Sequence, residues 1–290
     1  MQLLSKLKSV ACYAVATLAM IGSVNAAEVI KIGVPTGLSG ANSVVAPAVV
    51  QSSKLAVEEI NAAGGIMGKK VVLVVADDGS GAAGAQKAFD FLIFKEKVDV
   101  LITMETSAAR NGGLPIVSRG RTPFIYTSLY EGRSCNPYLY CNGAVPEQMV
   151  GPIVDYFMSK KGAKTFFLVG SDYAFGRGML EFTRAYIEKA GAKVVAEEYQ
   201  PMDANDWTAI ISKMRSTKPD AVIMSTAGGA PNVTLQKQFK AAGIQALVGN
   251  LSVDEATAKS MGADAAGIYI SASYLSRGKS PENKRFLAAM

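Results

Sequence analysis

The chain has 290 residues, of which 49% are hydrophobic and 19% charged, so it can bury the core of one large domain or two ordinary ones, and global disorder is excluded. The net charge of +6 falls to +4 without Lys6 and Lys8 near the N-terminus, and the basic residues are scattered, which argues against a nucleic-acid partner. Histidine is absent and the three cysteines lack CxxC spacing, so we expect no Ser-His-Asp or Cys-His nucleophile, no metal site and no cofactor.

Residues 1–26 have the pattern of a cleaved secretory signal peptide. The two lysines precede an apolar run over residues 10–21, and small residues follow, with cleavage expected after Ala26 or Ala27. The alternative of a transmembrane anchor is disfavoured because the apolar run is short for a membrane span. We therefore expect an exported protein that resides in the periplasm.

Export changes the interpretation of the two remaining cysteines. Cys135 and Cys141 lie in the turn-rich segment Ser-Cys-Asn-Pro-Tyr-Leu-Tyr-Cys-Asn. Because disulfides form and persist in oxidising compartments, we predict a local disulfide between them.

The first half of the mature chain alternates predicted strands with predicted helices, which is typical of a parallel sheet. The run Val71–Val75 is continuously apolar, so we expect this strand to be buried on both faces. The expected strands cover residues 29–34, 71–75, 98–104 and 122–126. One expected helix ends near residue 61, before Gly64-Gly65, and a second covers residues 82–96.

The second half repeats the alternation. The loop Gly170–Gly176 follows a strand, so it should lie at the edge of the sheet where open α/β folds bind ligands. Helices are expected over residues 149–161 and from residue 281, and strands over residues 165–169, 193–199, 221–226, 247–249 and 268–274.

An internal repeat links the two halves. Residues 55–102 and residues 182–223 each give helix, glycine stop, strand, helix and strand. Two α/β lobes of like construction make a cleft, where small ligands bind. The predicted division is a signal peptide over 1–26, lobe 1 over 27–147, lobe 2 over 148–272, and an incomplete return to lobe 1 over 273–290.

One motif suggests a dinucleotide site but is contradicted by its neighbours. Gly79-Ser-Gly-Ala-Ala-Gly84 matches GxGxxG, and Glu105 falls near the position of a ribose-binding acid. However, Asp77 and Asp78 would meet the pyrophosphate directly, and the motif follows the second strand instead of the first. We favour an aspartate-rich turn that leads into a helix.

Several motifs together resemble a known family. The chain resembles type I periplasmic solute-binding proteins of ABC importers, in the branched-chain amino acid and amide class. The motifs are Ile32–Gly40, Ala56–Ile66, Ala76–Asp78, Gly170–Gly176 and Lys240–Ile244, while Tyr126–Gly132 and Gly170–Tyr173 look most like the urea and short-amide branch.

The resemblance implies an α/β fold of two similar three-layer lobes with mainly parallel sheets, joined by hinge crossovers. It also implies a solute site at the strand ends, with these ligand-binding residues: Ser107, Tyr126, Ser128, Tyr130, Tyr173, Thr226 and Ala227. Glu105 is a further ligand-binding candidate that departs from the family, because it stands where the amide branch has an aromatic residue and could meet a cationic or amide N–H group. An alternative stays open for each of three residues. Ser107 could instead cap the following helix, Tyr126 could be a buried strand residue, and Glu105 could point away from the site.

Two further departures from the family pattern stand out. The amino-acid-binding branch carries an acid where this chain has Asn250–Asp254, so Asp254 or Glu255 would need a shifted register to meet an ammonium group. Family members also continue past the position of Met290, so the chain resembles a C-terminally truncated member.

The expected function is that of a solute receptor and not of an enzyme. It would capture a small polar solute, of the amide, urea or amino-acid type, and deliver it to the membrane permease of an ABC importer. The alternatives are a cytoplasmic ligand sensor of the same fold, which the leader disfavours, and an exported α/β enzyme, which the missing nucleophile motif disfavours.

Overall fold

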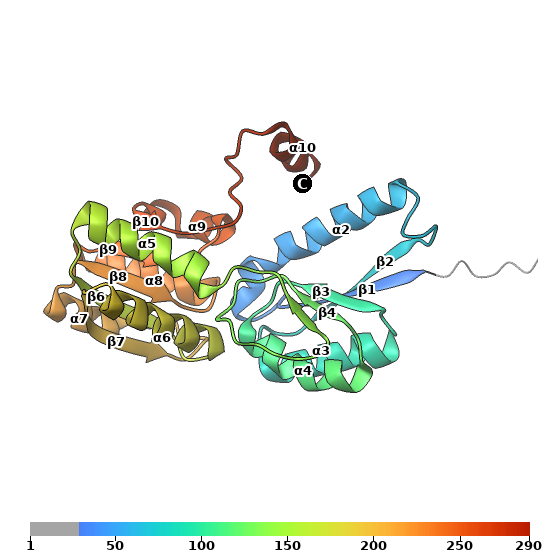
Figure 1. Ribbon diagram of the computed structural model, residues 1–290, viewed down its shortest axis with the longest axis horizontal. Helices are drawn as coiled ribbons and strands as arrows, with labels where there is room; N and C mark the ends of the chain where they lie inside the picture. Colours follow the sequence, from blue (N-terminus) through green and yellow to red (C-terminus); the bar gives the residue numbers. More distant parts are fainter. Residues whose placement is uncertain (1–28) are drawn as a thin grey trace, which may run out of the picture.

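The computed structural model describes residues 29–290, and the predicted signal peptide over residues 1–26 lies outside the described residues. Two lobes lie side by side and are joined by loops near the middle of the molecule (Figure 1). Each lobe contains one five-stranded sheet, and every strand pairing within the two sheets is parallel. This confirms the predicted α/β class with two similar lobes.

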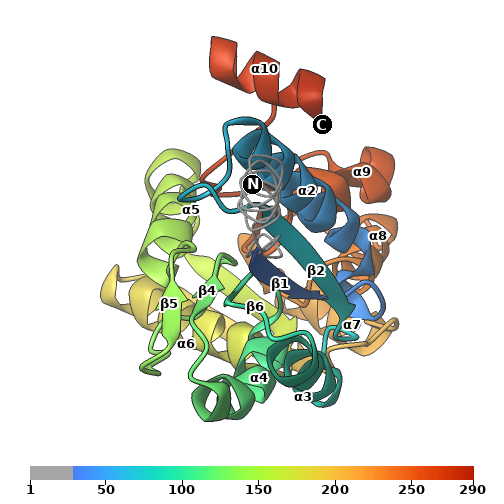
Figure 2. The same ribbon diagram turned by 90° about the vertical axis from the view of Figure 1, so that its right-hand side faces the viewer.

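Lobe 1 has the strand order β2-β1-β3-β4-β5. Helix α2 lies on one side of its sheet, and helices α3 and α4 lie on the other side (Figure 2). In chain order its elements are β1 (Ile30–Thr36), the 3₁₀ turn η1 (Ala41–Val44), α2 (Ala46–Ala62), β2 (Val71–Asp77), α3 (Ala82–Asp90), the π-helical turn η2 (Phe91–Lys95), β3 (Val100–Thr103), α4 (Ser107–Gly120), β4 (Phe124–Tyr126) and β5 (Leu139–Cys141).

Lobe 2 has the strand order β10-β9-β8-β6-β7. One core packs α5 and α6 against its sheet, around Phe157 and Phe166, and another packs α7 and α8 against the opposite face, around Trp207 and Phe239. Its elements are α5 (Pro146–Lys161), β6 (Thr165–Ser171), α6 (Ala174–Lys189), β7 (Lys193–Gln200), α7 (Thr208–Thr217), β8 (Ala221–Ser225), α8 (Ala230–Ala241), β9 (Leu247–Asn250), α9 (Glu255–Met261), η3 (Gly262–Ala265) and β10 (Ile268–Tyr269).

The sequence repeat corresponds to equivalent positions in the two sheets. Strand β1 lies between β2 and β3 in lobe 1, and β6 lies between β7 and β8 in lobe 2. The two matched segments therefore each supply the edge strand, a crossover helix and the strand on the other side of the central one. The lobes have the same order of construction because the same local pattern builds each of them.

Two expectations about strands were wrong, and one strand was missed. Val71 is buried, but residues 72–75 are only half-buried, because β2 is an edge strand of its sheet. The last strand ends at Tyr269 and not at residue 274, since only Ile268 and Tyr269 pair with β9. Strand β5 had no sequence prediction, and it extends the lobe 1 sheet beside β4.

The chain leaves the first sheet after Cys141 and enters lobe 2 with helix α5. After β10 it runs back across the molecule to α10 (Pro281–Ala289), which stands apart from both sheets (Figures 1 and 2). The end of α10 contacts α2, where Gln51 and Ser52 bond to Met290. Within the described residues, no helix is long and apolar enough to cross a membrane.

Candidate functional site

A small cavity lies between the lobes where the carboxyl ends of strands from both sheets meet. Its volume is about 70 Å³. Loops after β1, β3 and β4 supply its lobe 1 wall, and loops after β6, β8 and β9 supply its lobe 2 wall. It is lined by Asn42, Val45, Met104, Glu105, Thr106, Ser107, Tyr126, Ser128, Leu129, Tyr173, Phe175, Gly228, Ser252 and Asp254.

Five of the eight predicted ligand-binding residues line this cavity, namely Glu105, Ser107, Tyr126, Ser128 and Tyr173. The other three do not. Tyr130 packs edge-on against the Tyr126 ring, with 6.2 Å between ring centroids, so it lies behind the cavity wall.

Thr226 and Ala227 follow β8 and are fully buried beneath Gly228, which forms the wall instead. The Ala227 N–H is used within lobe 2, where it donates to the Ser171 hydroxyl. The Thr226 hydroxyl has no hydrogen-bond partner among the described residues. The loop after β8 therefore reaches the cavity through Gly228, one or two residues beyond the predicted positions.

The N-cap of helix α4 is Thr106 and not Ser107. The Thr106 hydroxyl accepts a hydrogen bond from the Ala109 N–H at 3.0 Å, as a cap residue does. Ser107 is the first helical residue, so its hydroxyl is free for other partners. It donates to the Glu131 carboxylate at 2.6 Å.

A buried ion pair lies directly behind Ser107. Arg110 has a side chain that is only 1% exposed, and it donates to the Glu131 carboxylate and to the Ser107 hydroxyl, the latter at 3.3 Å. Its guanidinium also lies over the rings of Tyr126 and Tyr130, 5.0 and 5.6 Å from their centroids. Since removal of one partner of a buried ion pair is strongly destabilising, Arg110 and Glu131 hold each other in place.

Glu105 uses both carboxyl oxygens within the protein. One accepts the Gly37 N–H at 2.6 Å, and the other accepts from Thr106 N–H at 2.7 Å and from the Asn42 amide at 3.1 Å. These bonds tie the loops after β1 and β3 together. Glu105 is thus at the cavity wall, as predicted, but its oxygens are directed to its own loops.

Burial and the neighbouring Asp78 together determine the protonation of Glu105. Both residues are 1% exposed, and the Asp78 charge acts on Glu105. Burial, followed by the Asp78 charge, raises the pKa of Glu105 to about 8, while burial raises the pKa of Asp78 to about 6. At neutral pH Glu105 therefore retains its proton while Asp78 is mainly ionised.

Two tyrosine hydroxyls approach the cavity from opposite lobes. Tyr126 is fully buried at the end of β4 and also lines the cavity, and its hydroxyl donates to the backbone carbonyl of Glu105. Burial raises the pKa of Tyr126 to about 12. Tyr173 reaches over from lobe 2, where burial, followed by the nearby Tyr126 and Glu131, raises its pKa well above the usual value.

The glycine-rich turn after β2 is closed by its own aspartates. Asp77 accepts the Gly79 N–H at 3.0 Å, and Asp78 accepts the Ser80 N–H at 2.8 Å. The N–H groups that a dinucleotide phosphate would need are therefore already bonded to carboxylates. The aspartate-rich turn favoured by the sequence is what the structure contains.

Sequence reasoning missed Asn42 and Ser252, and it offered Asp254 only with a shifted register. Asn42 belongs to the loop after β1, and its position after a strand was the only signal. Asp254 lies on the rim from lobe 2 and caps α9, where it accepts the Thr257 N–H at 2.7 Å. Asp254 is thus an acidic residue at the cavity, at the position that the sequence analysis offered only with a shifted register.

The lobes touch each other around the cavity. A Cβ atom on Gly228 would lie 3.2 Å from the Asn42 amide oxygen, and one on Gly178 would lie 2.7 Å from the Glu131 Cβ atom. Each pair joins a residue of lobe 2 to a residue of lobe 1. The structure therefore shows the lobes closed on the cavity.

A family model described as a periplasmic binding protein matches residues 29–290. The chain belongs to the periplasmic binding protein family. This confirms the resemblance to type I solute-binding proteins of the branched-chain amino acid class.

Three similar proteins illustrate the family. A Leu/Ile/Val-binding protein homologue of Brucella melitensis is 29% identical, with alignment over 81% of this chain. The substrate-binding protein LivJ of Streptococcus pneumoniae, in complex with isoleucine, is 26% identical with a TM-score of 0.75, over 90% of this chain and 76% of that one. A solute-binding protein of Rhodopseudomonas palustris, in complex with 3,4-dihydroxybenzoic acid, shares the fold at 22% identity, with a TM-score of 0.77 over 90% and 73% of the two chains.

This chain is shorter than its relatives. It spans 64% of the length of the Brucella homologue. These periplasmic binding proteins are solute-binding proteins and not enzymes, which agrees with the expectation of binding without catalysis. Among the described residues, no group of three or more acidic or cysteine side chains is placed to hold a metal ion.

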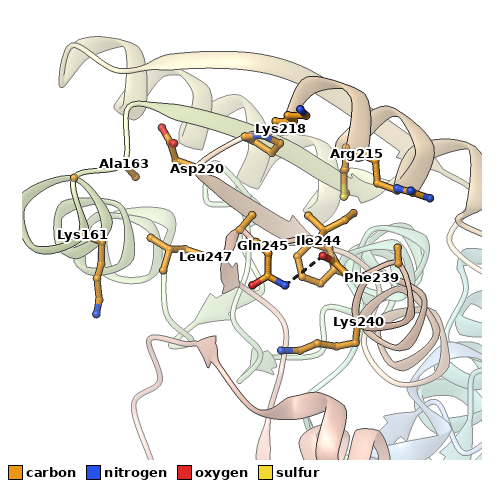
Figure 3. Close-up of a pocket in the computed structure, with 16 residues that line it drawn as sticks. Lys161, Ala163, Arg215, Lys218, Asp220, Phe239, Lys240, Ile244, Gln245 and Leu247 are labelled. Carbon is orange, nitrogen blue, oxygen red and sulfur yellow. Dashed lines mark hydrogen bonds between the residues drawn. The ribbon is translucent and has the colours of Figure 1, made fainter.

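A larger hollow, of about 990 Å³, lies at the opposite edge of the lobe 2 sheet, around the loops that precede β6, β8 and β9 (Figure 3). The basic side chains Lys161, Arg215 and Lys240 lie around it and do not converge on one point (Figure 3). The hydrogen bond drawn there joins the Gln245 amide to the Gly243 carbonyl, within one loop. All residues that line this hollow belong to lobe 2, so we assign the solute site to the smaller cavity between the lobes.

The predicted disulfide is not formed in the structure, where Cys135 and Cys141 are both free. Cys141 is in β5, where it pairs with Tyr126 of β4 and packs against the core of lobe 1. Cys135 lies in the exposed loop before that strand. The strand pairing holds Cys141 against the sheet while Cys135 remains in solvent.

We expect the two thiols to react at different rates with a thiol reagent. Cys135 is exposed and should react quickly, whereas burial raises the pKa of Cys141 and leaves less of the reactive thiolate. Titration of the native, unreduced protein with Ellman's reagent measures both rates. If the unfolded, unreduced protein shows no free thiol at these two positions, the predicted disulfide is formed after all.

Proposed function

We propose that this protein captures a small polar solute between its two lobes in the periplasm and delivers it to the membrane permease of an ABC importer. The observation that carries the proposal is the cavity of about 70 Å³ between facing strand ends, with polar side chains from both lobes. Open α/β sheets bind ligands at this edge. Membership of the periplasmic binding protein family supports the same function.

The solute class that fits best is a small amide or urea. The cavity is far smaller than the roughly 300–1,000 Å³ of pockets for drug-sized ligands, so it suits only a few non-hydrogen atoms. The Tyr173 hydroxyl and the first N–H groups of α4 are donors for a carbonyl oxygen, and hydroxyl oxygens of lobe 1 are acceptors for N–H groups.

A second candidate is a small amino acid. Asp254 places a carboxylate from lobe 2 at the cavity rim, where a ligand ammonium group would find an opposite charge. The relatives named for leucine, isoleucine and valine support this alternative. The Asp254 side chain already caps α9, so it is a weaker candidate for a dedicated ammonium partner.

Ligand capture works as a population shift. Only the closed arrangement lets Tyr173 of lobe 2 and Ser107 of lobe 1 contact the same solute. A solute that binds the closed state better therefore raises its population. No bond of the solute is made or broken, so the solute should be recovered unchanged.

A thermal-shift screen tests the proposal directly. We expect acetamide or urea to raise the melting temperature, because a ligand that binds only the folded state stabilises it. Leucine, isoleucine and benzoate test the carboxylate-bearing alternatives. No shift with any of these solutes would contradict the proposed function, and conversion of the solute, seen by NMR, would favour the enzyme alternative.

The Tyr173→Phe variant should bind the solute about fivefold more weakly, because it loses one hydrogen-bond donor worth about 1 kcal/mol. The ring and its packing against Phe175 remain, so the melting temperature without solute should hardly change. Calorimetric titration of both proteins measures the ratio. Equal affinities would remove Tyr173 from the site.

Export is tested separately from binding. Cell fractionation should find the protein in the periplasm, and N-terminal sequencing of that fraction should begin at Ala27 or Glu28. A protein that stays in the cytoplasm with residue 1 intact would support the cytoplasmic sensor.

A further inference from the structure

The direction of the hydrogen bonds at Ser107 distinguishes this cavity from one built for a carboxylate. A serine hydroxyl has one proton to donate and two lone pairs that accept. The Ser107 proton is donated to the Glu131 carboxylate at 2.6 Å, and one lone pair accepts from Arg110 at 3.3 Å. The remaining lone pair is the only bonding position of Ser107 left for a solute.

Tyr126 repeats this arrangement on the same wall. Its hydroxyl proton is donated to the backbone carbonyl of Glu105. Its pKa is raised to about 12, so the proton is retained at neutral pH and stays in that bond. Ser107 and Tyr126 therefore both offer lone pairs, and neither offers a proton, to the cavity.

Glu131 holds this arrangement in place. Its side chain is 13% exposed and carries the charge that balances the buried Arg110, so Arg110 has no unpaired positive charge for a solute anion. One Glu131 oxygen accepts a hydrogen bond from Arg110, and the other accepts the hydrogen bond from the Ser107 hydroxyl. The protein thus supplies its own carboxylate where a solute carboxylate would otherwise use the Ser107 hydroxyl.

We infer that Glu131 is a specificity-determining residue, which makes the cavity select a solute N–H group over a carboxylate oxygen; this inference rests on the proposed solute-binding function. An amide can place its oxygen on the N–H groups of α4 and its NH₂ group on the lone pairs of Ser107 and Tyr126. A carboxylate of the same shape would place its second oxygen against those lone pairs, which is repulsive.

Acetamide and acetate are the probes, since they have nearly the same shape and differ in the group that would meet Ser107. Calorimetric titration should show that the wild-type protein binds acetamide at least tenfold more tightly than acetate. Glu131→Gln removes the internal carboxylate and leaves the Arg110 charge unbalanced, so this ratio should fall at least tenfold. Glu181→Gln is the matched control, because it removes an equal charge from an exposed pair with Arg133 and should leave the ratio unchanged.

Three results would overturn the inference: acetate binding as tight as acetamide binding in the wild type, the same ratio in Glu131→Gln, or binding of neither probe. If Glu131→Gln does not give a cooperative melt, Ser107→Ala decides instead. It should weaken acetamide binding about fivefold or more and leave acetate binding unchanged, and equal losses for both probes count against the inference. The wider solute screen judges the proposed function separately, since tight acetate binding would reject the selectivity and still support solute capture.

Discussion

The free energy of unfolding of this protein should fall as the pH rises from about 5 to about 8. The cause is the Asp78–Glu105 pair beneath the cavity wall. Burial and the Asp78 charge raise the pKa of Glu105 to about 8, from an ordinary value of 4.5, and burial raises the pKa of Asp78 to about 6. The unfolded chain loses both protons near the ordinary values, so between these limits the folded chain binds more protons.

When the folded state binds one more proton than the unfolded state, stability falls by about 1.4 kcal/mol for each pH unit. The fall begins above the ordinary carboxyl pKa and levels off near pH 8, where folded Glu105 also ionises. The chain has no histidine, so few other groups titrate in this window to obscure the effect.

Urea unfolding at a series of pH values measures the slope. Glu105→Gln is the informative variant, because its amide cannot ionise and the decline should flatten. Glu96→Gln is a control for the loss of a carboxyl group elsewhere in lobe 1, at a half-buried pair with Lys31. A stability that is constant or rises between pH 5 and 8 in the wild type would show that folded Glu105 does not retain its proton in this range.

The fold class and the order of most strands and helices could be predicted from local sequence patterns. The alternation of apolar strands with helices predicted two parallel sheets, and the repeat predicted two lobes with like strand order. Strand β5 escaped because it has only three residues and follows Pro137 in a turn-rich segment. Its pairing with β4 is a tertiary fact that no local pattern indicates.

The candidate site was predictable to the level of loops but not of hydrogen bonds. The family motif placed Ser107, Tyr126 and Tyr173 at the cavity, because strand ends and their loops are visible in sequence. The pairing of Arg110 with Glu131 was not visible, since the two residues come from separate elements and meet only in the folded lobe. The direction of the Ser107 hydrogen bond depends on that pairing, so it could not be read from the motif.

Solute affinity should fall about tenfold or more in the variant Gly178→Ala, although the change lies outside the cavity. Gly178 is on α6 of lobe 2 and faces Glu131, the residue that balances Arg110 in lobe 1. The added methyl would lie 2.7 Å from the Glu131 Cβ atom, which is too close for two carbon atoms. Overpacking of this kind costs about 1–3 kcal/mol, and here it is met only when the lobes are closed.

The substitution has the opposite effect on the helix itself. Alanine is favoured over glycine in a helix interior by about 1 kcal/mol, so lobe 2 should be slightly more stable and the variant should fold well. Gly151→Ala is the matched control, because it makes the same change on α5 and its methyl meets only the Tyr186 side chain of the same lobe, at 3.3 Å. It should retain the wild-type affinity.

Calorimetry with the solute from the screen gives the affinities, and small-angle X-ray scattering gives the mean separation of the lobes. In Gly178→Ala the radius of gyration should increase and respond less to solute, because each 1.4 kcal/mol against closure shifts the open-to-closed ratio tenfold. A variant that binds as tightly as the wild type would show that the α6 contact with Glu131 is not part of the binding-competent state. A loss of affinity with unchanged scattering would instead mean that the methyl acts through Glu131 on the cavity wall, and closure would then not limit affinity.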